Sequence, residues 1–284
     1  MAVFDPQTLR DWRFALQSQT YDARDAILYA LGVGMPLTPG EGPDLGYLLE
    51  DGLKVLPSFA VTLASPGMWV KDPALGIDWV KILHMAQAAT FHAPLPPAAR
   101  ITSQPRVKSL HDRGVGKGAV CVLERDITDA ETGTRYCTLE QTILLRGNDG
   151  FGGPAAPPAE RLTMPDRVPD AVVSVTTSDR AALIYRLSGD LNPLHADYAV
   201  ARRGGFDRPI LHGLASYGTA AAVVLRSFAA DDPARLTSLA LRFSGVVFPG
   251  DTLRFDLWQD GARVLFQAHV GDRKVLDQGV ATIS

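Results

Sequence analysis

The densest cluster of residues able to do chemistry is the segment YRLSGDLNPLHADY, residues 185–198. It places Asp190, Asn192 and His195 within six positions, and the Asn-Pro pair favours a turn followed by the start of a helix. With Asp190 in that turn and His195 in the first helical turn, a carboxylate and an imidazole face one space, where they can hold a water molecule and move its proton. The alternative is structural: Asp190 caps the helix and His195 satisfies it.

A second element, PILHG, places Gly213 at the start of an Ala-rich stretch. The first backbone N–H groups of a helix have no intrahelical partner, and the helix dipole adds a partial positive charge there. A glycine also lets a ligand carbonyl approach closely. The combination predicts an oxyanion site, with an ordinary helix N-terminus as the alternative. We interpret the neighbouring His212 as a structural residue at the helix entry rather than as a base.

These residues need a helix and a sheet to position them, and the second half of the chain predicts both. Residues 211–229 are Ala-rich and apolar nearly all round, and Pro233 lies shortly beyond them, which predicts a buried helix. The strand-like runs that follow, separated by turns carrying Gly beside Asp or Pro, are 236–248, 252–259, 263–270 and 274–283. A buried helix followed by an antiparallel meander predicts a sheet wrapped around that helix.

The first half shows a fainter version of the same pattern. Its strand-like runs are 99–110, 118–126 and 134–146. Residues 52–65 are the candidate for the matching helix, although Pro57 weakens that prediction. A Gly- and Pro-rich seam at 146–170 separates the halves and is typical of a linker. We therefore expect an internal duplication, with domains at 1–150 and 151–284.

Composition excludes several classes of function. Lys and Arg number 28 and Asp and Glu 31, and the resulting net charge of −3 argues against a nucleic-acid partner. The hydrophobic share of 46% is enough for a sizeable core and argues against disorder. Cys121 and Cys137 have no CxxC or CxxH spacing, so we expect neither a disulfide framework nor a structural metal site.

No segment of the sequence predicts export or a membrane span. The first twenty residues carry acidic side chains and no continuous apolar stretch, unlike a secretory signal. The longest apolar run, 219–225, is far shorter than the roughly 20 residues that cross a bilayer. The final residues, ATIS, are not a peroxisomal SKL-type address. We expect no membrane partner and a cytoplasmic location.

The segment YRLSGDLNPLHADYAVARRGGFDRPILHGLASYG resembles the signature of the MaoC-like (R)-specific enoyl-CoA hydratases, the hydratase 2 family. The string SGDxNPLH stands intact at 188–195 and Leu-His-Gly at 211–213. The segments YDARDAILYALGVG, VLPSFAVTL and GVGKGAVC and the RGNDGFGG seam resemble the long form found in peroxisomal multifunctional enzymes and their bacterial relatives. The resemblance covers nearly the whole chain.

The resemblance implies an α+β double hot-dog fold, with antiparallel sheets each wrapped around a long central helix. Its first half would be degenerate and accommodate the substrate. It implies reversible syn addition of water to a trans-2-enoyl-CoA, giving (3R)-3-hydroxyacyl-CoA. Carried over, Asp190 and His195 are the catalytic pair, Asn192 orients them, and the Gly213 N–H binds the thioester oxygen. Acyl-CoA is then the substrate, no metal or other cofactor is expected, and a homodimer is expected because edge strands of hot-dog sheets commonly pair.

Residues that bind the rest of the substrate are marked less clearly. Arg113, Lys117 and Arg208 are candidates for the CoA phosphates, with solvated surface charges as the alternative. His84 and Gln87 match the ends of a His-Gly-Glu-Gln motif that is frequent in the family. This chain reads HMAQ there, so Ala86 stands in place of the acidic residue.

Several functions stay open at this point. The first is hydration of a long or bulky fatty or steroid-side-chain acyl-CoA, and its variant uses the same residues on a short branched or dicarboxylic acyl-CoA. The others are a non-catalytic acyl-CoA-binding subunit and a thioesterase, because a fold alone does not determine function. The intact Asp190 and His195 favour the hydratase.

Overall fold

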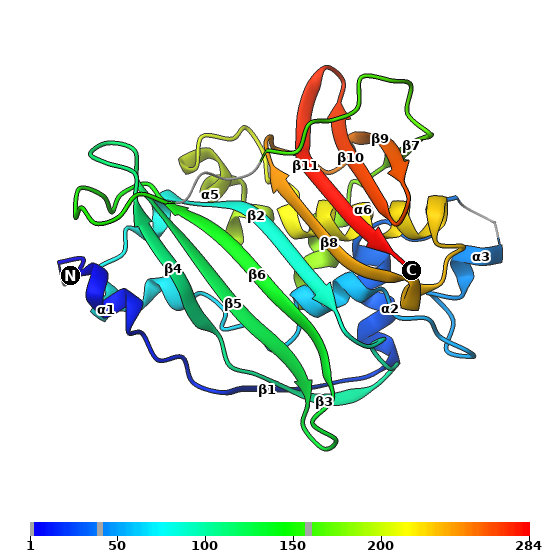
Figure 1. Cartoon of the computed structure of the whole chain (residues 1–284), viewed down its shortest axis with the longest axis horizontal. Helices are drawn as coiled ribbons and strands as arrows, with labels where there is room; N and C mark the ends of the chain where they lie inside the picture. The colour runs from blue at the N-terminus through cyan, green and yellow to red at the C-terminus, as the bar shows by residue number, and fades with distance from the viewer. Residues whose placement is uncertain (1–2, 39–41, 157–160) are drawn as a thin grey trace.

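The computed structural model of the chain describes residues 3–38, 42–156 and 161–284. One antiparallel sheet, with eleven strands in these residues, runs through both halves of the chain in the order β1-β3-β5-β6-β2-β8-β11-β10-β9-β7, and β4 also pairs with β5. Figure 1 shows this sheet curving from the first-half strands to the second-half strands.

The first-half strands are β1 (Gln17–Tyr21), β2 (Ile82–Phe91), β3 (Ala99–Ser103), β4 (Arg106–Asp112), β5 (Ala119–Asp129) and β6 (Arg135–Leu145). The second-half strands are β7 (Ala171–Thr176), β8 (Leu236–Phe243), β9 (Thr252–Asp260), β10 (Arg263–Val270) and β11 (Arg273–Ile283). The α-helices are α1 (Pro6–Arg10), α2 (Ala23–Gly32), α3 (Gly42–Leu45), α4 (Ala181–Tyr185), α5 (Tyr198–Arg203) and α6 (Gly213–Phe228). The short 3-10 helices are η1 (Pro57–Val61), η2 (Trp69–Lys71), η3 (Pro73–Leu75), η4 (Trp79–Lys81), η5 (Arg186–Ser188), η6 (Pro193–His195) and η7 (Pro233–Arg235).

The helix predicted at 211–229 forms as α6 and fills the concave side of the second-half sheet. Residues 215–225 are all buried, as an apolar stretch without a polar face requires. The predicted meander forms as β8 to β11, and alternating residues of β9 such as Leu253 and Phe255 are fully buried. The sheet wrapped around a helix is therefore confirmed for the second half.

In its described residues the first half has no such central helix, and the prediction of one at 52–65 is wrong. Only η1 forms there, a single 3-10 segment that is buried and packs against α6. Pro57 has no N–H to donate, and Ala64 takes a φ of +43°, so the chain leaves the helical path at both ends of the segment. Among the described residues the one long helix is therefore α6 of the second half, and it packs against η1 and β2 of the first half.

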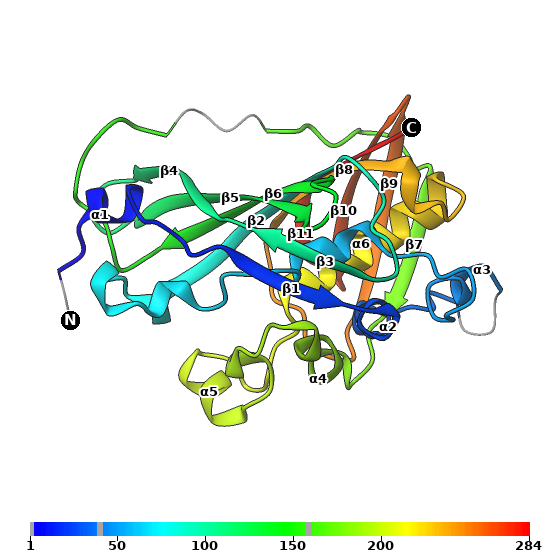
Figure 2. The same ribbon diagram turned by 90° about the horizontal axis from the view of Figure 1, so that it is seen from below.

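The structure also tests two other segments, one in the first half and the seam that follows it. The run 99–110 is two strands, β3 and β4, because Pro105 between them cannot donate to a ladder. The described parts of the seam at 146–170 contain no helix or strand, as expected of a linker, and residues 157–160 lie outside the described ranges. Figure 2 shows the described part of the seam after residue 160 lying over the sheet, where Leu162 exchanges two hydrogen bonds with the Gln278 side chain.

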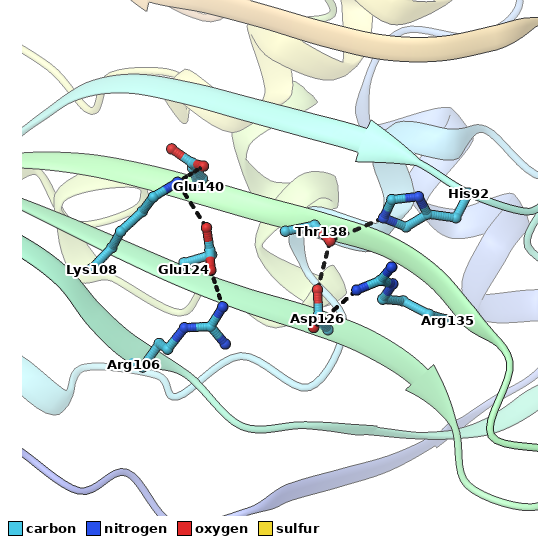
Figure 3. Close-up of polar contacts among 8 residues, drawn as sticks. All are labelled: His92, Arg106, Lys108, Glu124, Asp126, Arg135, Thr138 and Glu140. Carbon is cyan, nitrogen blue, oxygen red and sulfur yellow. Dashed lines mark hydrogen bonds and ion pairs between the residues drawn. The ribbon is translucent and has the colours of Figure 1, made fainter.

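The outer face of the first-half sheet carries paired charges on β4, β5 and β6 (Figure 3). Glu124 on β5 binds both Arg106 and Lys108 of β4, and Lys108 also reaches Glu140 on β6. An antiparallel sheet commonly turns one polar face to solvent and packs its apolar face on the core, and this sheet does the same. None of the helices in the described ranges has the length and hydrophobicity that a membrane-spanning helix needs.

Candidate active site

The loop that carries the SGDxNPLH string is held in shape by its own residues. Gly189 ends η5 with a φ of +118°, a conformation that side chains rarely adopt. The Asn192 side chain accepts a hydrogen bond from the Leu194 N–H at 3.2 Å, and Pro193 opens η6. Asn192 therefore caps η6, while the Oδ1 of Asp190 accepts from the Asn192 N–H at 3.2 Å.

Asp190, His195 and His212 come together at this loop, with ligand-type side-chain atoms within 4.8 Å of one another. His195 is 8% exposed, and its Nδ1 lies 2.9 Å from the carbonyl oxygen of Ile210. A carbonyl can only accept, so Nδ1 carries the proton and Nε2 keeps a free lone pair. The arrangement gives a carboxylate beside an imidazole that can accept a proton.

Burial sets the charge state of this imidazole. It lowers the pKa of His195 below the ordinary value, while the Ile210 carbonyl and the Asp190 carboxylate act in the opposite direction. The side chain is therefore neutral near neutral pH. A neutral imidazole is the form that a general base requires.

His212 makes two contacts with this pair that the sequence pattern did not reveal. Its Nε2 lies 3.1 Å from the backbone oxygen of Asp190, and its ring stacks on His195 with centroids 3.7 Å apart. It is 1% exposed, and burial, with the neighbouring His195 adding to the effect, lowers its pKa to about 2. The Leu-His-Gly string marks the residue, but nothing in a separation of seventeen positions predicts the stack on His195.

Gly213 is the first residue of α6, as the sequence predicts. No side chain caps this helix in the part of the chain that the structure describes, and its earliest backbone bond runs from the Ala215 N–H to the His212 carbonyl. The Gly213 N–H therefore lies ahead of the helical bonds, at the positive end of the dipole. A Cβ at Gly213 would lie 3.2 Å from Cε1 of Phe243, so a side chain here would crowd that ring.

His84 reaches the same region from β2. Its ring packs against Phe243 with centroids 4.8 Å apart, and the Asp190 carboxylate acts on it electrostatically. Burial lowers the pKa of His84 to about 4. Gln87 is buried further along β2, with its Nε2 donating to the Ala88 carbonyl at 3.1 Å. Phe243, which sequence reasoning missed, is thus the link between His84 and Gly213.

Ala86, which stands where the His-Gly-Glu-Gln motif has its acidic residue, points to the other face of the sheet. Ala86 pairs directly with Arg242 of β8, so the two side chains share a face. Phe243 is the next residue along β8 and points to the opposite face, toward Gly213 and His84. A side chain at position 86 therefore points away from the site, and the register shifts between His84 and Ala86 to allow it.

The basic candidates do not gather in one place. Arg113 and Lys117 are exposed in the turn between β4 and β5, where the Arg113 Nη1 donates to the Lys117 carbonyl at 3.4 Å. Arg208 is exposed in the loop before α6, and its guanidinium lies 5.0 Å from the centre of the Phe248 ring. The three candidates therefore stand in two different loops, one between β4 and β5 and one before α6.

The trio of Asp190, His195 and His212 has the residue types of a metal site but not the geometry. The two imidazole planes lie 27° apart and are stacked, so their in-plane lone pairs run side by side and do not converge on one ion. Rotating either ring would break its bond to the Ile210 or the Asp190 carbonyl. The arrangement fits proton transfer better than metal binding.

Known families and proteins match this chain along its length. An MFE-2 hydratase 2 N-terminal domain matches residues 19–147, and a MaoC like domain matches residues 160–280. The 3-hydroxyacyl-thioester dehydratase Y of Mycobacterium tuberculosis is 38% identical over 273 residues, 90% of each chain. The peroxisomal enoyl-CoA hydratase 2 of Arabidopsis thaliana is 34% identical over 270 residues, 89% of this chain and 87% of its own length.

Solved structures agree with the sequence matches. A MaoC-like dehydratase from Phytophthora capsici superposes with a TM-score of 0.85, at 32% identity and with 99% of both chains covered. A Mycobacterium tuberculosis protein described as having a double hot-dog fold gives a TM-score of 0.56 at 18% identity, over 94% of this chain and 96% of that one, which bears on the fold alone. The α+β double hot-dog fold is thereby confirmed.

Proposed function

Since the chain belongs to the MaoC-like dehydratase family, in the form with an N-terminal hydratase 2 domain, we propose that it hydrates trans-2-enoyl-CoA reversibly to (3R)-3-hydroxyacyl-CoA. The observation that carries the proposal is the meeting of Asp190 and His195 beside the open end of α6. Adding water to the β carbon of an enoyl thioester needs a base, a proton source and a group that polarises the carbonyl. This site supplies all three.

In the proposed reaction, Asp190 and His195 hold the attacking water between them. The free Nε2 of His195 accepts a proton as the oxygen bonds to the β carbon, and the pair returns a proton to the α carbon on the same face, which makes the addition syn. The Gly213 N–H and the α6 dipole stabilise the negative charge that develops on the thioester oxygen. Asn192 keeps the loop folded so that Asp190 points inward.

The two halves take different roles in this proposal. Residues 151–284 form the catalytic unit and residues 1–150 accommodate the acyl group, with η1 standing where the first half would otherwise carry a helix. That replacement favours a long or bulky acyl chain. A short branched or dicarboxylic acyl-CoA is the alternative substrate. Arg113, Lys117, Arg208, His84 and Gln87 stay proposed substrate-binding residues.

We further propose a reaction without metal or cofactor, a homodimer and a cytoplasmic location. The reaction needs no metal or cofactor beyond the CoA carried by the substrate, because the side chains and backbone of the site provide its acid–base and electrostatic groups. The homodimer is tested by light scattering of the purified chain. The cytoplasmic location is tested by imaging a tagged chain, since the related protein of Arabidopsis thaliana is named peroxisomal.

Activity is tested with a series of trans-2-enoyl-CoA thioesters from four to sixteen carbons, following the loss of the conjugated enoyl absorbance and the chirality of the product. We expect (3R)-3-hydroxyacyl-CoA, with kcat/KM rising along the series. A dependence that peaks at the shortest thioester would favour the short-chain alternative. Binding of acyl-CoA without turnover of any member would favour the non-catalytic subunit, and release of free CoA would favour a thioesterase.

A further inference from the structure

His212 touches both members of the catalytic pair at once. Its Nε2 lies 3.1 Å from the Asp190 carbonyl, and its ring lies against the ring of His195 at 3.7 Å. We propose that His212 is a positioning residue that keeps Asp190 aligned with His195 chiefly through its hydrogen bond to the Asp190 carbonyl, and this inference rests on the proposed function. The two contacts are chemically different, so different substitutions can remove them one at a time.

The hydrogen bond determines the protonation of the ring. The Asp190 carbonyl can only accept, so Nε2 carries the hydrogen and Nδ1 does not. Nδ1 is buried and has no partner among the described residues. Tyr185 of α4, Arg186 of η5, His195 of η6 and the Asp190 carboxylate, within 4.8 Å, face this ring. Burial, with His195 and Arg186 adding to it, lowers the pKa of His212, so Nδ1 stays without a proton. His212 is therefore a permanently neutral donor and does not exchange protons with the substrate.

The position of His212 in the chain makes the alignment effective. Residues 210–213 are consecutive, and three of them hold the site: Ile210 fixes His195, His212 fixes Asp190, and Gly213 offers its N–H. The proposed base, the proposed acid and the oxyanion donor are thus all held by one short segment at the start of α6. A small shift of Asp190 relative to His195 would misplace the water, and an error of about 1 Å in such a group can cost about 10²-fold in rate.

Two variants separate this role from simple packing. In His212→Gln the amide nitrogen stands close to the position of Nε2 and can still donate to the Asp190 carbonyl, whereas the ring is lost. In His212→Phe the ring and the stack remain and the donor is lost. A packing role predicts that Phe, the better filler, is tolerated better. A positioning role predicts the reverse order.

The measurement is kcat and KM for enoyl-CoA hydration, with Ser216→Ala as a matched control one turn further along α6. Ser216 is also buried, and its hydroxyl has no partner among the described residues. We expect His212→Phe to lower kcat about 10²-fold with KM unchanged, His212→Gln to stay within about tenfold of the wild type, and Ser216→Ala to match it. A His212→Phe enzyme as active as His212→Gln, or more active, would overturn the inference.

A second readout does not depend on turnover or on the variants folding. Nitrogen-15 NMR of the histidine-labelled wild-type chain reports which ring nitrogen bears hydrogen. We expect His212 to stay neutral and protonated at Nε2 from pH 9 to pH 5, and a His212 that titrates in this range or is protonated at Nδ1 would contradict the inference. Absence of hydratase activity in the wild type would instead remove the proposed function, and the NMR result alone would then decide whether His212 holds Asp190.

Discussion

Nη2 of Arg125 on β5 donates to the carbonyl oxygen of Val61, at the end of η1, at a distance of 2.7 Å. Nη1 of the same guanidinium donates to the Leu63 carbonyl at 2.5 Å. A first-half helix would have used these carbonyls internally, so Arg125 replaces the helical bonds that are missing. The segment it holds adjoins the loop at 188–195 that carries Asp190 and His195, since the Thr62 carbonyl lies 3.8 Å from where a Cβ of Gly189 would be.

Replacing Arg125 should therefore destabilise the protein. Arg125→Met leaves two carbonyls without a donor, and bonds to a charged group contribute about 1.5–3 kcal/mol. We expect a decrease of about 2 kcal/mol in the free energy of unfolding, measured by urea titration. Arg106→Met is the control, because the Arg106 side chain is 61% exposed and its pair with Glu124 is worth less than about 1 kcal/mol (Figure 3). Equal effects of the two substitutions would mean that Arg125 does not hold η1.

Close packing of α2 against α6 depends on Gly218. A Cβ at Gly218 would lie 2.4 Å from Cγ1 of Val33 and 2.6 Å from the hydroxyl of Tyr29. We expect Gly218→Ala to lower the free energy of unfolding by about 1–3 kcal/mol, the usual cost of overpacking, although alanine favours helices. Thermal melting measures this, with Gly42→Ala as the control because a Cβ there meets nothing within 4 Å. A stabilised Gly218→Ala variant would show that α2 and α6 are not in close contact at Gly218.

The free energy of unfolding should decrease at acidic pH because His84 is half-buried in its neutral form. The pKa of His84 is about 4 in the folded chain and about 6.5 in the unfolded chain, so between these values the unfolded state binds more protons. The free energy of unfolding therefore decreases as the pH falls from 6.5 to 4, by about 3 kcal/mol from this residue. His84→Gln should remove that part of the slope.

The check is a set of urea titrations of wild type and His84→Gln between pH 8 and pH 4. We expect the difference in unfolding free energy between the two to change across the window, with the variant gaining relative stability at low pH. A difference that stays constant with pH would show that His84 is solvated and titrates normally.

Much of the second half could be predicted from local patterns. The apolar stretch at 211–229 and the Gly-bearing turns after it specify α6 and the strands β8 to β11 with little ambiguity, because each signal lies within one element. Gly189, Asn192 and Pro193 have local conformational roles, which is why the string predicted a turn and a short helix. The meeting of Asp190 and His195 followed from that turn.

The first half and the long-range contacts could not be predicted in this way. The apolar side chains of residues 52–65 predict a helix, but they are apolar because the segment lies in the core. No local pattern indicates that Arg125 donates to the Val61 and Leu63 carbonyls in place of helical hydrogen bonds. The contacts of Phe243 with His84 and Gly213 join three elements, and the joining strands β2 and β8 pair across the two halves. Such contacts depend on the tertiary fold, for which one sequence carries no local signal.

In the proposed reaction Asp190 and His195 act together on one water molecule. The most direct test is kcat for trans-2-enoyl-CoA hydration by Asp190→Asn and His195→Gln, with acyl-CoA binding by calorimetry and circular dichroism showing that each variant is folded and binds substrate. General acid–base groups contribute about 10²–10⁴-fold, so we expect each variant to lose that much of kcat while it still binds acyl-CoA. Turnover near the wild-type rate in both folded variants would show that Asp190 and His195 are not the acid–base groups.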